Sequence, residues 1–220
     1  QANTGGRQER ITSYFSNSVL SMEAGPAKGR VLEMLEPYAD SLMPGTIEGY
    51  RLPQSDGSAR NRRNIRAADA LLSQAGWTVQ DGLRRNAQGT PFEITVTLKQ
   101  GDTESQSMMD IYQQALERLG ITLTTEVLDS AQYKERTQVY DFDMAYYRRG
   151  LSLSPGNEQM LYWGAYGVEQ PGTRNWMGMN SPAAEAMIAK LVGSTSHEEF
   201  LAAVKALDRI VTAGRYVIPI

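Results

Sequence analysis

The order of strand and helix patterns in the middle of the chain constrains the fold more than any other feature. Residues 92–98 alternate apolar and polar side chains without interruption, and shorter alternations follow at 121–127 and 142–147. Between them, apolar residues at helical spacing predict helices at about 103–119 and 130–139. Strands connected through helices run parallel with right-handed crossovers, so this order predicts an α/β fold with a partly parallel sheet flanked by helices.

Further helix patterns lie on both sides of this region. The expected helices are 27–36, a helix from Asn61 or Asn64 to Ala75, 182–192 and 197–213. Asn61 or Asn64 is expected to cap the second helix, and Ser196 begins a capping box for the last. Asp81 and Gly82 are expected to form the turn of a small hairpin.

The 220 residues are enough for one large domain or two small ones. Residues 1–60 are the least regular and rich in turn signals, and we expect them to wrap over the rest of the lobe. Residues 61–220 are expected to form an α/β lobe. Because the chain starts at Gln1 and stops in what reads as the start of a strand, both ends look cut, and we expect a longer protein whose leader lies outside this sequence.

A long segment after the third expected strand holds the candidate ligand-binding side chains. Long loops in compact domains are usually functional or disordered, and the aromatic content here argues against disorder. Aromatic, arginine and asparagine side chains are typical of a ligand cleft. They are Arg148, Arg149, Asn157, Tyr162, Trp163, Tyr166, Arg174, Asn175 and Trp176.

Two interpretations of the aromatic side chains in this segment remain open. The aromatic side chains can form ordinary core, because aromatic residues pack more often than they bind ligands. They can also line a cleft, which we favour because they lie between glycines and polar residues without helical or strand periodicity. Ligands of open parallel sheets bind outside the carboxyl ends of the strands, and residues 148–163 leave the third expected strand at that end.

Composition excludes several other functions. The net charge of −3 gives no electrostatic reason to expect nucleic acid, and no apolar run approaches the length of a membrane span. The chain has no cysteine and one histidine, so a zinc site lacks its usual ligands, and we expect no metal and no cofactor. A Ser-His-Asp mechanism would need His197 as its base, and nothing around that residue resembles a nucleophile elbow.

Two charged groups have a functional and a simpler reading. Asp141 and Asp143 fall on the same face of a strand and could act as a carboxylate pair, although capped or solvated acids at a strand entry are the favoured interpretation. The same holds for a basic run, for which a solvated helix start is favoured over a phosphate site. That run consists of Arg60, Arg62, Arg63 and Arg66.

The order and spacing of several segments resemble one protein family. The later segments are YDFDM at 140–144, SLSPGNEQMLYWGAYG at 152–167, GTRNWMGMNSPAAEAMI at 172–188 and ALDRIVTAGRYVIPI at 206–220. The earlier ones are 14–18, 35–38, LLSQAGW at 71–77 and 119–121. The chain resembles the C-terminal lobe of extracytoplasmic solute-binding proteins of the oligopeptide/dipeptide class (family 5), and within that class the YejA-type branch.

The resemblance implies a periplasmic-binding-protein-like (type II) lobe of a two-lobed protein that closes on a peptide or peptide-like ligand by a hinge. It implies a membrane permease of an ABC importer as partner, and a location in the periplasm or on a lipid anchor outside the cell. We expect a monomer, no nucleic-acid partner and no enzymatic activity.

One departure from the family concerns the ligand. Many oligopeptide binders carry an aspartate four residues before the proline that corresponds to Pro155, and this aspartate holds the free amino group of the peptide. Here Leu151 occupies that position, so the resemblance implies that free peptide N-termini are not recognised in the usual way. Arg148 and Arg149 could instead favour an acidic or N-blocked ligand, because guanidinium groups pair well with carboxylates and phosphates.

Two other functions remain as alternatives. A protein-interaction module would use the aromatic segment as an exposed apolar patch to dock a partner. An α/β hydrolase would use Asp141 or Asp143, but the sequence offers no nucleophile with an adjacent base.

Overall fold

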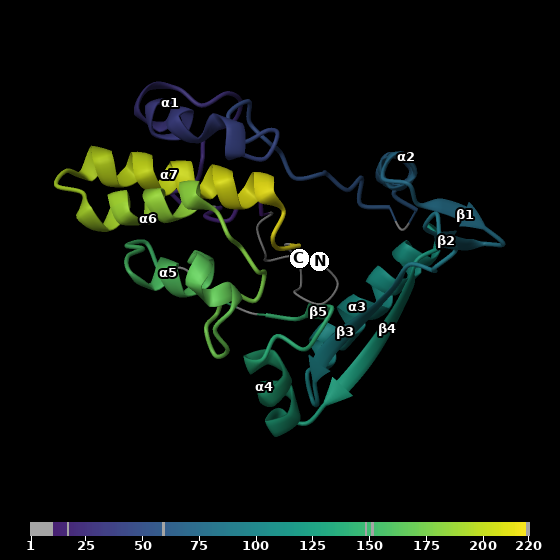
Figure 1. Ribbon diagram of the computed structural model, residues 1–220. Coiled ribbons are helices and arrows are strands. Elements are labelled where there is room, and N and C mark those ends of the chain that lie inside the picture. The colour runs from purple at the N-terminus through teal and green to yellow at the C-terminus, as the bar shows by residue number, and fades with distance from the viewer. Residues whose placement is uncertain (1–10, 17, 59, 148, 151, 219–220) are drawn as a thin grey trace. The chain divides into compact units, whose positions relative to one another are not determined.

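A computed structural model gives the structure of the chain. It describes residues 11–16, 18–58, 60–147, 149–150 and 152–218. Figure 1 shows its helices and strands with their labels.

The chain divides into two compact units. Unit 1 contains Gln1–Leu52 and Arg149–Ile220, and unit 2 contains Pro53–Arg148. This grouping differs from the expected division after residue 60, because it separates the sheet from the C-terminal helices and joins the first 52 residues to those helices. That residues 61–220 act as one lobe stays a prediction.

Unit 2 contains the expected parallel sheet. Its strands are β3 (Glu93–Lys99), β4 (Thr122–Leu128) and β5 (Met144–Ala145), in the order β4-β3-β5 and parallel throughout. The connecting helices are α3 (Thr103–Glu117) and α4 (Ser130–Gln138) (Figure 1). The fold class predicted from the strand and helix patterns is therefore confirmed, a mixed α/β structure with a parallel sheet and helices.

The third strand is shorter than the expected 142–147, and side chains end it on both sides. The carboxylate of Asp143 accepts the backbone N–H of Thr95 at 2.9 Å. Beyond the strand, the hydroxyl of Tyr133 donates to the carbonyl oxygen of Tyr146 at 2.7 Å. These side chains take backbone groups that a longer ladder would have paired, so β5 keeps only two residues.

The ends of α3 show how local sequence sets the sheet connections. Asp102 caps the helix by accepting the backbone N–H of Ser105 at 3.1 Å. Gly120 follows the helix with φ of +74°, and a Cβ atom there would lie 2.8 Å from the backbone nitrogen of Arg84. Only glycine adopts this positive φ without strain and also leaves out the Cβ atom that would clash here. Apolar side chains of β3, α3, β4 and the turn between α3 and β4 form the core of the unit: Val96, Leu98, Met109, Leu116, Leu119, Ile121 and Leu123.

A helix and a hairpin complete unit 2. The elements are α2 (Arg62–Gln74), β1 (Thr78–Gln80) and β2 (Leu83–Arg85), and β1 pairs antiparallel with β2 as the hairpin prediction required. The capping prediction for α2 is wrong. Asn61 precedes the helix with φ of 37° and makes no side-chain cap, and the side-chain amide of Asn64 donates to the carbonyl of Gln54.

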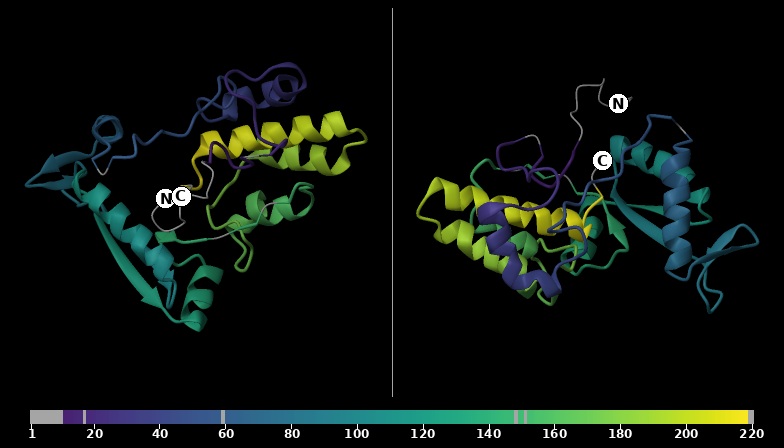
Figure 2. Two further views of the ribbon diagram at one scale, coloured as in Figure 1. Left: turned by 180° about the vertical axis from the view of Figure 1, so that it is seen from behind. Right: turned by 90° about the horizontal axis from the view of Figure 1, so that it is seen from above.

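Unit 1 is built on two long helices. They are α6 (Pro182–Gly193) and α7 (His197–Gly214), which lie side by side, and α1 (Gly29–Leu35) packs on α7 (Figure 1, Figure 2). A 3-10 helix, η1 (Glu36–Ser41), continues α1. The predicted Ser196 cap is confirmed, because its hydroxyl accepts the N–H of Glu199 at 3.1 Å.

The segment expected to be a loop contains two short helices. They are α5 (Glu158–Trp163) and η2 (Ala165–Val168). The buried side chains of α5 are Gln159, Tyr162 and Trp163, which fall on one helical face. The reading of this segment as free of helical periodicity is therefore wrong, because six residues are too few for the pattern to stand out.

Two adjacent charged residues of α7 hold the N-terminal segment of unit 1. Asp208 is buried and accepts the hydroxyl of Ser13 at 2.6 Å and the backbone N–H groups of Phe15 at 3.0 Å and Met22 at 2.7 Å. Burial raises the pKa of Asp208, while these hydrogen bonds act in the opposite direction.

Arg209 holds the following residues of the same segment. Its guanidinium donates to the carbonyl oxygens of Glu23 at 2.9 Å, Gly25 at 2.8 Å and Thr46 at 3.2 Å. Burial lowers the pKa of Arg209. The described residues before position 50 are thus tied to α7 through main-chain groups rather than through apolar packing alone.

Candidate functional site

Two of the candidate residues of unit 1, Arg149 and Tyr162, lie in direct contact. The guanidinium carbon of Arg149 lies 3.1 Å from the ring centroid of Tyr162 and 5.2 Å from that of Tyr14. Tyr14 in turn meets Trp163 edge to face, with ring centroids 4.8 Å apart. The segment before α5 and the segment around Tyr14 therefore build one aromatic–arginine cluster, which we define as Arg149, Tyr14, Tyr162, Trp163 and Arg174.

Arg174 approaches the same ring from the segment before α6. Its Nη1 donates to the hydroxyl of Tyr162 at 2.7 Å, and its guanidinium carbon lies 5.6 Å from the ring centroid. Desolvation by burial lowers the pKa of Arg149 to about 10, with the positive charge of Arg174 adding to it and Tyr162 and Glu158 opposing it. Arg149 thus remains charged at neutral pH while being partly removed from water.

One carboxylate, that of Glu158, lies close enough to influence Arg149 electrostatically. It accepts the backbone N–H of Gly156 at 2.9 Å and the side-chain amide of Gln159 at 3.1 Å. Burial opposes ionisation of Glu158, but these hydrogen bonds and the charge of Arg149 outweigh it and lower the pKa. The carboxylate is therefore held at the start of α5 as an anion.

Trp163 and Asn175 lie in the interior of unit 1. Trp163 is 0% exposed and belongs to the main apolar core, and Asn175 is 1% exposed. The side-chain amide of Asn175 donates to the carbonyls of Gly164 at 2.9 Å and Met179 at 2.8 Å, and its oxygen accepts the N–H of Met179. These two side chains fix the shape of the segment, and Tyr162 is largely buried beside them.

The remaining candidates differ in exposure. Asn157 is exposed and Trp176 is half-buried. Arg148 and Leu151 lie outside the described residues. The structure therefore brings Arg149, Tyr162 and Trp163 together and keeps Asn157 at the surface. It adds Tyr14, whose only signal in the sequence was its place in a family-like segment.

Unit 2 has a hollow at the carboxyl end of β3 that the sequence analysis did not assign to particular residues. It has a volume of about 240 Å³ and is lined by Lys99, Asp102, Tyr133 and Tyr146. Burial raises the pKa of Tyr133, with a contribution from the charge of Asp102. The strand-end rule could have pointed here, since Lys99 ends one parallel strand and Tyr146 follows the next.

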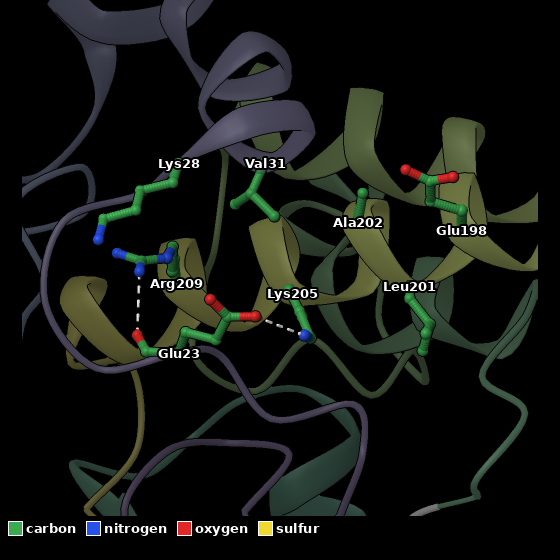
Figure 3. A pocket seen from close by; sticks show the side chains of 8 residues that line it. All are labelled: Glu23, Lys28, Val31, Glu198, Leu201, Ala202, Lys205 and Arg209. Atoms are coloured by element: carbon green, nitrogen blue, oxygen red, sulfur yellow. Dashed lines mark hydrogen bonds and ion pairs between the residues drawn. The ribbon is translucent and has the colours of Figure 1, made fainter.

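A third place, between α1 and α7 of unit 1, is a hollow of about 210 Å³ (Figure 3). Its lining mixes both signs of charge, and Glu23 pairs with Lys205 at 2.9 Å across it. The guanidinium of Arg209 reaches the carbonyl of Glu23 there, as the dashed line in Figure 3 shows. Three of its charged residues, Glu23, Lys205 and Arg209, are thus used to hold the N-terminal segment.

The acids and the histidine considered for catalysis are engaged elsewhere. Asp141 pairs with Arg136 at 2.9 Å, and Asp143 accepts the Thr95 N–H described above. His197 stacks on Phe200 in the first turn of α7. In the described part of the chain, no three His, Cys, Asp or Glu side chains gather as a metal site would require. The helices within the described ranges also lack the length and apolar character of a membrane crossing.

Residues 29–170 match the family described as "Bacterial extracellular solute-binding proteins, family 5 Middle". A protein of Brucella melitensis whose name states only that it is a binding protein is 36% identical over 98% of this chain and 35% of its own length. In Agrobacterium fabrum, "Probable peptide-binding protein YejA" is 33% identical over 97% of this chain and 35% of its own length. The chain thus spans 35% of the length of these relatives.

Solved structures show the same fold. The oligopeptide-binding protein AppA of Bacillus subtilis, in complex with a nonapeptide, superimposes with a TM-score of 0.63 over 86% of this chain and 38% of that chain, at 16% identity. The fold is that of type II periplasmic binding proteins, as the resemblance implied.

Proposed function

Because this chain belongs to the bacterial extracellular solute-binding proteins of family 5, we propose that it forms one wall of a binding site for a peptide or peptide-like molecule. The ligand would be enclosed by hinge closure against a second lobe outside this chain. The loaded protein would deliver it to the membrane permease of an ABC importer, in the periplasm or on a lipid anchor outside the cell.

The observation that carries this proposal is the aromatic–arginine cluster, of which Arg149, Tyr162 and Trp163 lie within the family-matched residues 29–170. The guanidinium carbon of Arg149 lies over the ring of Tyr162 at 3.1 Å from its centroid, next to a segment that holds exposed Asn157. Ligand sites combine aromatic walls with a few fixed polar groups, and this cluster supplies both. Arg148, Leu151 and Trp176 are proposed to contribute from the same stretch of sequence.

The buried candidates would act indirectly. Asn175 bonds two carbonyls and one N–H around Gly164 and Met179, and Trp163 fills the core beneath Tyr14. Such fixed supports hold a binding surface in one geometry, which lowers the entropy lost when a ligand binds. Two similar proteins add support, since a relative of 33% identity is called a probable peptide-binding protein and a solved structure of the same fold holds a nonapeptide.

A second candidate function, a docking module for another protein, is favoured by exposed apolar side chains in the same stretch. Leu153 is 70% exposed, Leu161 is 42% exposed and Tyr166 is 43% exposed. Contiguous exposed apolar surface marks interaction sites in many proteins. In the peptide-binding proposal, the same side chains are wall residues that the closed state covers.

The test is a thermal-shift titration of the full-length protein with a peptide library that contains free and N-formylated members. A ligand that binds only the folded state stabilises it by about 2.7 kcal/mol at a hundredfold excess over Kd. The proposal predicts a rise in Tm with at least one peptide series and none with the matching mixture of free amino acids. If no peptide of the library raises Tm, whether its N-terminus is free or blocked, the proposal is contradicted.

A further inference from the structure

Arg149 has donors that the described chain does not use. A guanidinium carries five N–H donors in a fixed plane. Arg149 is half-buried and lies on the rings of Tyr162 and Tyr14, and within the described ranges it makes no hydrogen bond or ion pair. The contact with the two rings satisfies none of the N–H donors, so the guanidinium keeps donors for an acceptor.

A second cation lies at the same ring. The guanidinium of Arg174 is 5.6 Å from the Tyr162 centroid and bonds the Tyr162 hydroxyl. Two guanidinium groups around one ring repel each other, and this repulsion contributes to the lowered pKa of Arg149. An anion bound between them would remove that repulsion, so the arrangement favours anion binding over a neutral partner.

The nearby carboxylate of Glu158 does not form an ion pair with Arg149 among the described residues. Glu158 is committed to the backbone N–H of Gly156 and to the side chain of Gln159, at 2.9 Å and 3.1 Å. It forms no ion pair with Arg149 in the described structure, although its charge is felt there. The charge of Arg149 therefore faces a carboxylate that is already hydrogen-bonded to other groups.

Two further polar atoms in the cluster have no partner among the described residues. They are the hydroxyl oxygen of Tyr14 and the indole nitrogen of Trp163, both buried. Buried polar atoms are nearly always hydrogen-bonded. A bound molecule could supply the missing hydrogen-bond partner of these two atoms. The Tyr14 ring lies beneath the Arg149 guanidinium and meets Trp163 edge to face, so both atoms belong to side chains of the same cluster, and this observation is independent of the charge argument.

We propose that Arg149 and Arg174 form an anion subsite around Tyr162 that binds a carboxylate or phosphate group of the ligand. Planar guanidinium groups bind both anions through paired N–H donors. The inference deepens the proposed function, and rests on it for the peptide-like remainder of the ligand. The anion itself could be a side-chain carboxylate, the C-terminal carboxylate or a phosphate.

Paired probes distinguish these sources by calorimetry on the full-length protein. Ala-Ala-Ala as a free acid is compared with its C-terminal amide, and Ala-Glu-Ala amide with Ala-Gln-Ala amide. Inorganic phosphate is titrated separately against chloride at constant ionic strength. The variants are Arg149→Gln, Arg149→Lys and Arg174→Gln, and Arg51→Gln is the matched control because Arg51 is exposed in the same unit.

At least one acidic probe is expected to bind wild type and Arg51→Gln roughly ten- to hundredfold more tightly than its amide, as hydrogen bonds to charged groups allow. In Arg149→Gln the affinity of the acidic probe should be within about twofold of that of its amide. Arg149→Lys should show an intermediate preference, because lysine keeps the positive charge but lacks the paired N–H donors of the guanidinium. Arg174→Gln should also lower the preference for the acidic probe. This second variant tests the subsite if Arg149→Gln folds poorly.

The outcomes separate the two proposals. Equal binding of acids and amides by wild type would overturn the anion subsite and leave peptide binding intact. If no peptide binds but phosphate stabilises wild type and not Arg149→Gln, the subsite stands and the peptide proposal fails. If wild type and Arg149→Gln bind phosphate with equal affinity, and wild type binds no acidic probe more tightly than its amide, the subsite is refuted.

Discussion

Replacing Asp208 by asparagine tests how the N-terminal segment is held on α7. The two carboxylate oxygens accept different backbone donors: Oδ1 takes the N–H of Phe15 at 3.0 Å, and Oδ2 takes that of Met22 at 2.7 Å. Asparagine has one acceptor oxygen. Whichever way its amide is turned, an NH₂ group faces one of these buried N–H groups.

The magnitude follows from this mismatch. Leaving a buried donor unsatisfied costs about 1–3 kcal/mol. Burial raises the pKa of Asp208, so removing its charge returns part of that loss. A net destabilisation of the segment by about 2 kcal/mol is expected, which corresponds to a roughly thirtyfold change in its opening equilibrium.

Hydrogen–deuterium exchange measures that opening directly in the full-length protein. The peptides that contain Phe15 and Met22 should exchange roughly thirtyfold faster in Asp208→Asn, provided closing is fast relative to exchange. Asp40→Asn is the control, because Asp40 is exposed in the same unit and should leave exchange unchanged. Exchange in Asp208→Asn within about twofold of wild type would refute the assigned role of this carboxylate.

Three further substitutions probe other parts of the structure. Gly120→Ala should lower the free energy of unfolding of unit 2 by about 2 kcal/mol or more in urea melts. Gly101→Ala, at a glycine with φ of +88° and open space around it, should lower it by only about 1 kcal/mol. Equal losses would contradict the close approach of Gly120 to the backbone of Arg84. Arg84→Met should cost about 3 kcal/mol by the same assay, because this buried guanidinium bonds two carbonyls and a carboxylate, and a loss below about 1 kcal/mol would contradict that role. Lys205→Met should cost less than about 1 kcal/mol at neutral pH, because Glu23 is 74% exposed. The Lys205 hydrogen bond lowers the pKa of Glu23, so its contribution is present above the unfolded pKa and disappears as pH falls through the folded one; a loss that persists in acid would contradict the pairing.

The sheet was predictable because its signals are local. Alternation at 92–98 and helical spacing on either side of 121–127 predicted elements whose ends differ from the structure by at most two residues. The third strand was overestimated because its end is set by the side chain of Asp143 on the backbone of Thr95, 48 residues away in sequence. Periodicity carries no information about such a contact.

The site was predictable in composition and less so in geometry. The sequence identified Arg149 and Tyr162 as residue types suited to a ligand surface, and the structure stacks them. It gave no way to separate Trp163, which is fully buried, from Asn157, which is exposed, because a helix of six residues hides its own periodicity.

Long-range partners were the other gap. Tyr14 reaches Trp163 from the other end of the chain, with ring centroids 4.8 Å apart. Asp208 likewise accepts the hydroxyl of Ser13, 195 residues away in sequence. Spacing along the sequence cannot reveal contacts that only the folded chain creates.

The most direct test of the central claim is native mass spectrometry of the full-length protein, followed by release and sequencing of whatever it binds from a defined peptide mixture. The account predicts added masses that match peptides or peptide-like molecules, with acidic members enriched over their amides. An unliganded spectrum in the presence of the whole mixture, or bound masses that contain no amino acids, would contradict the assignment of this chain to peptide binding.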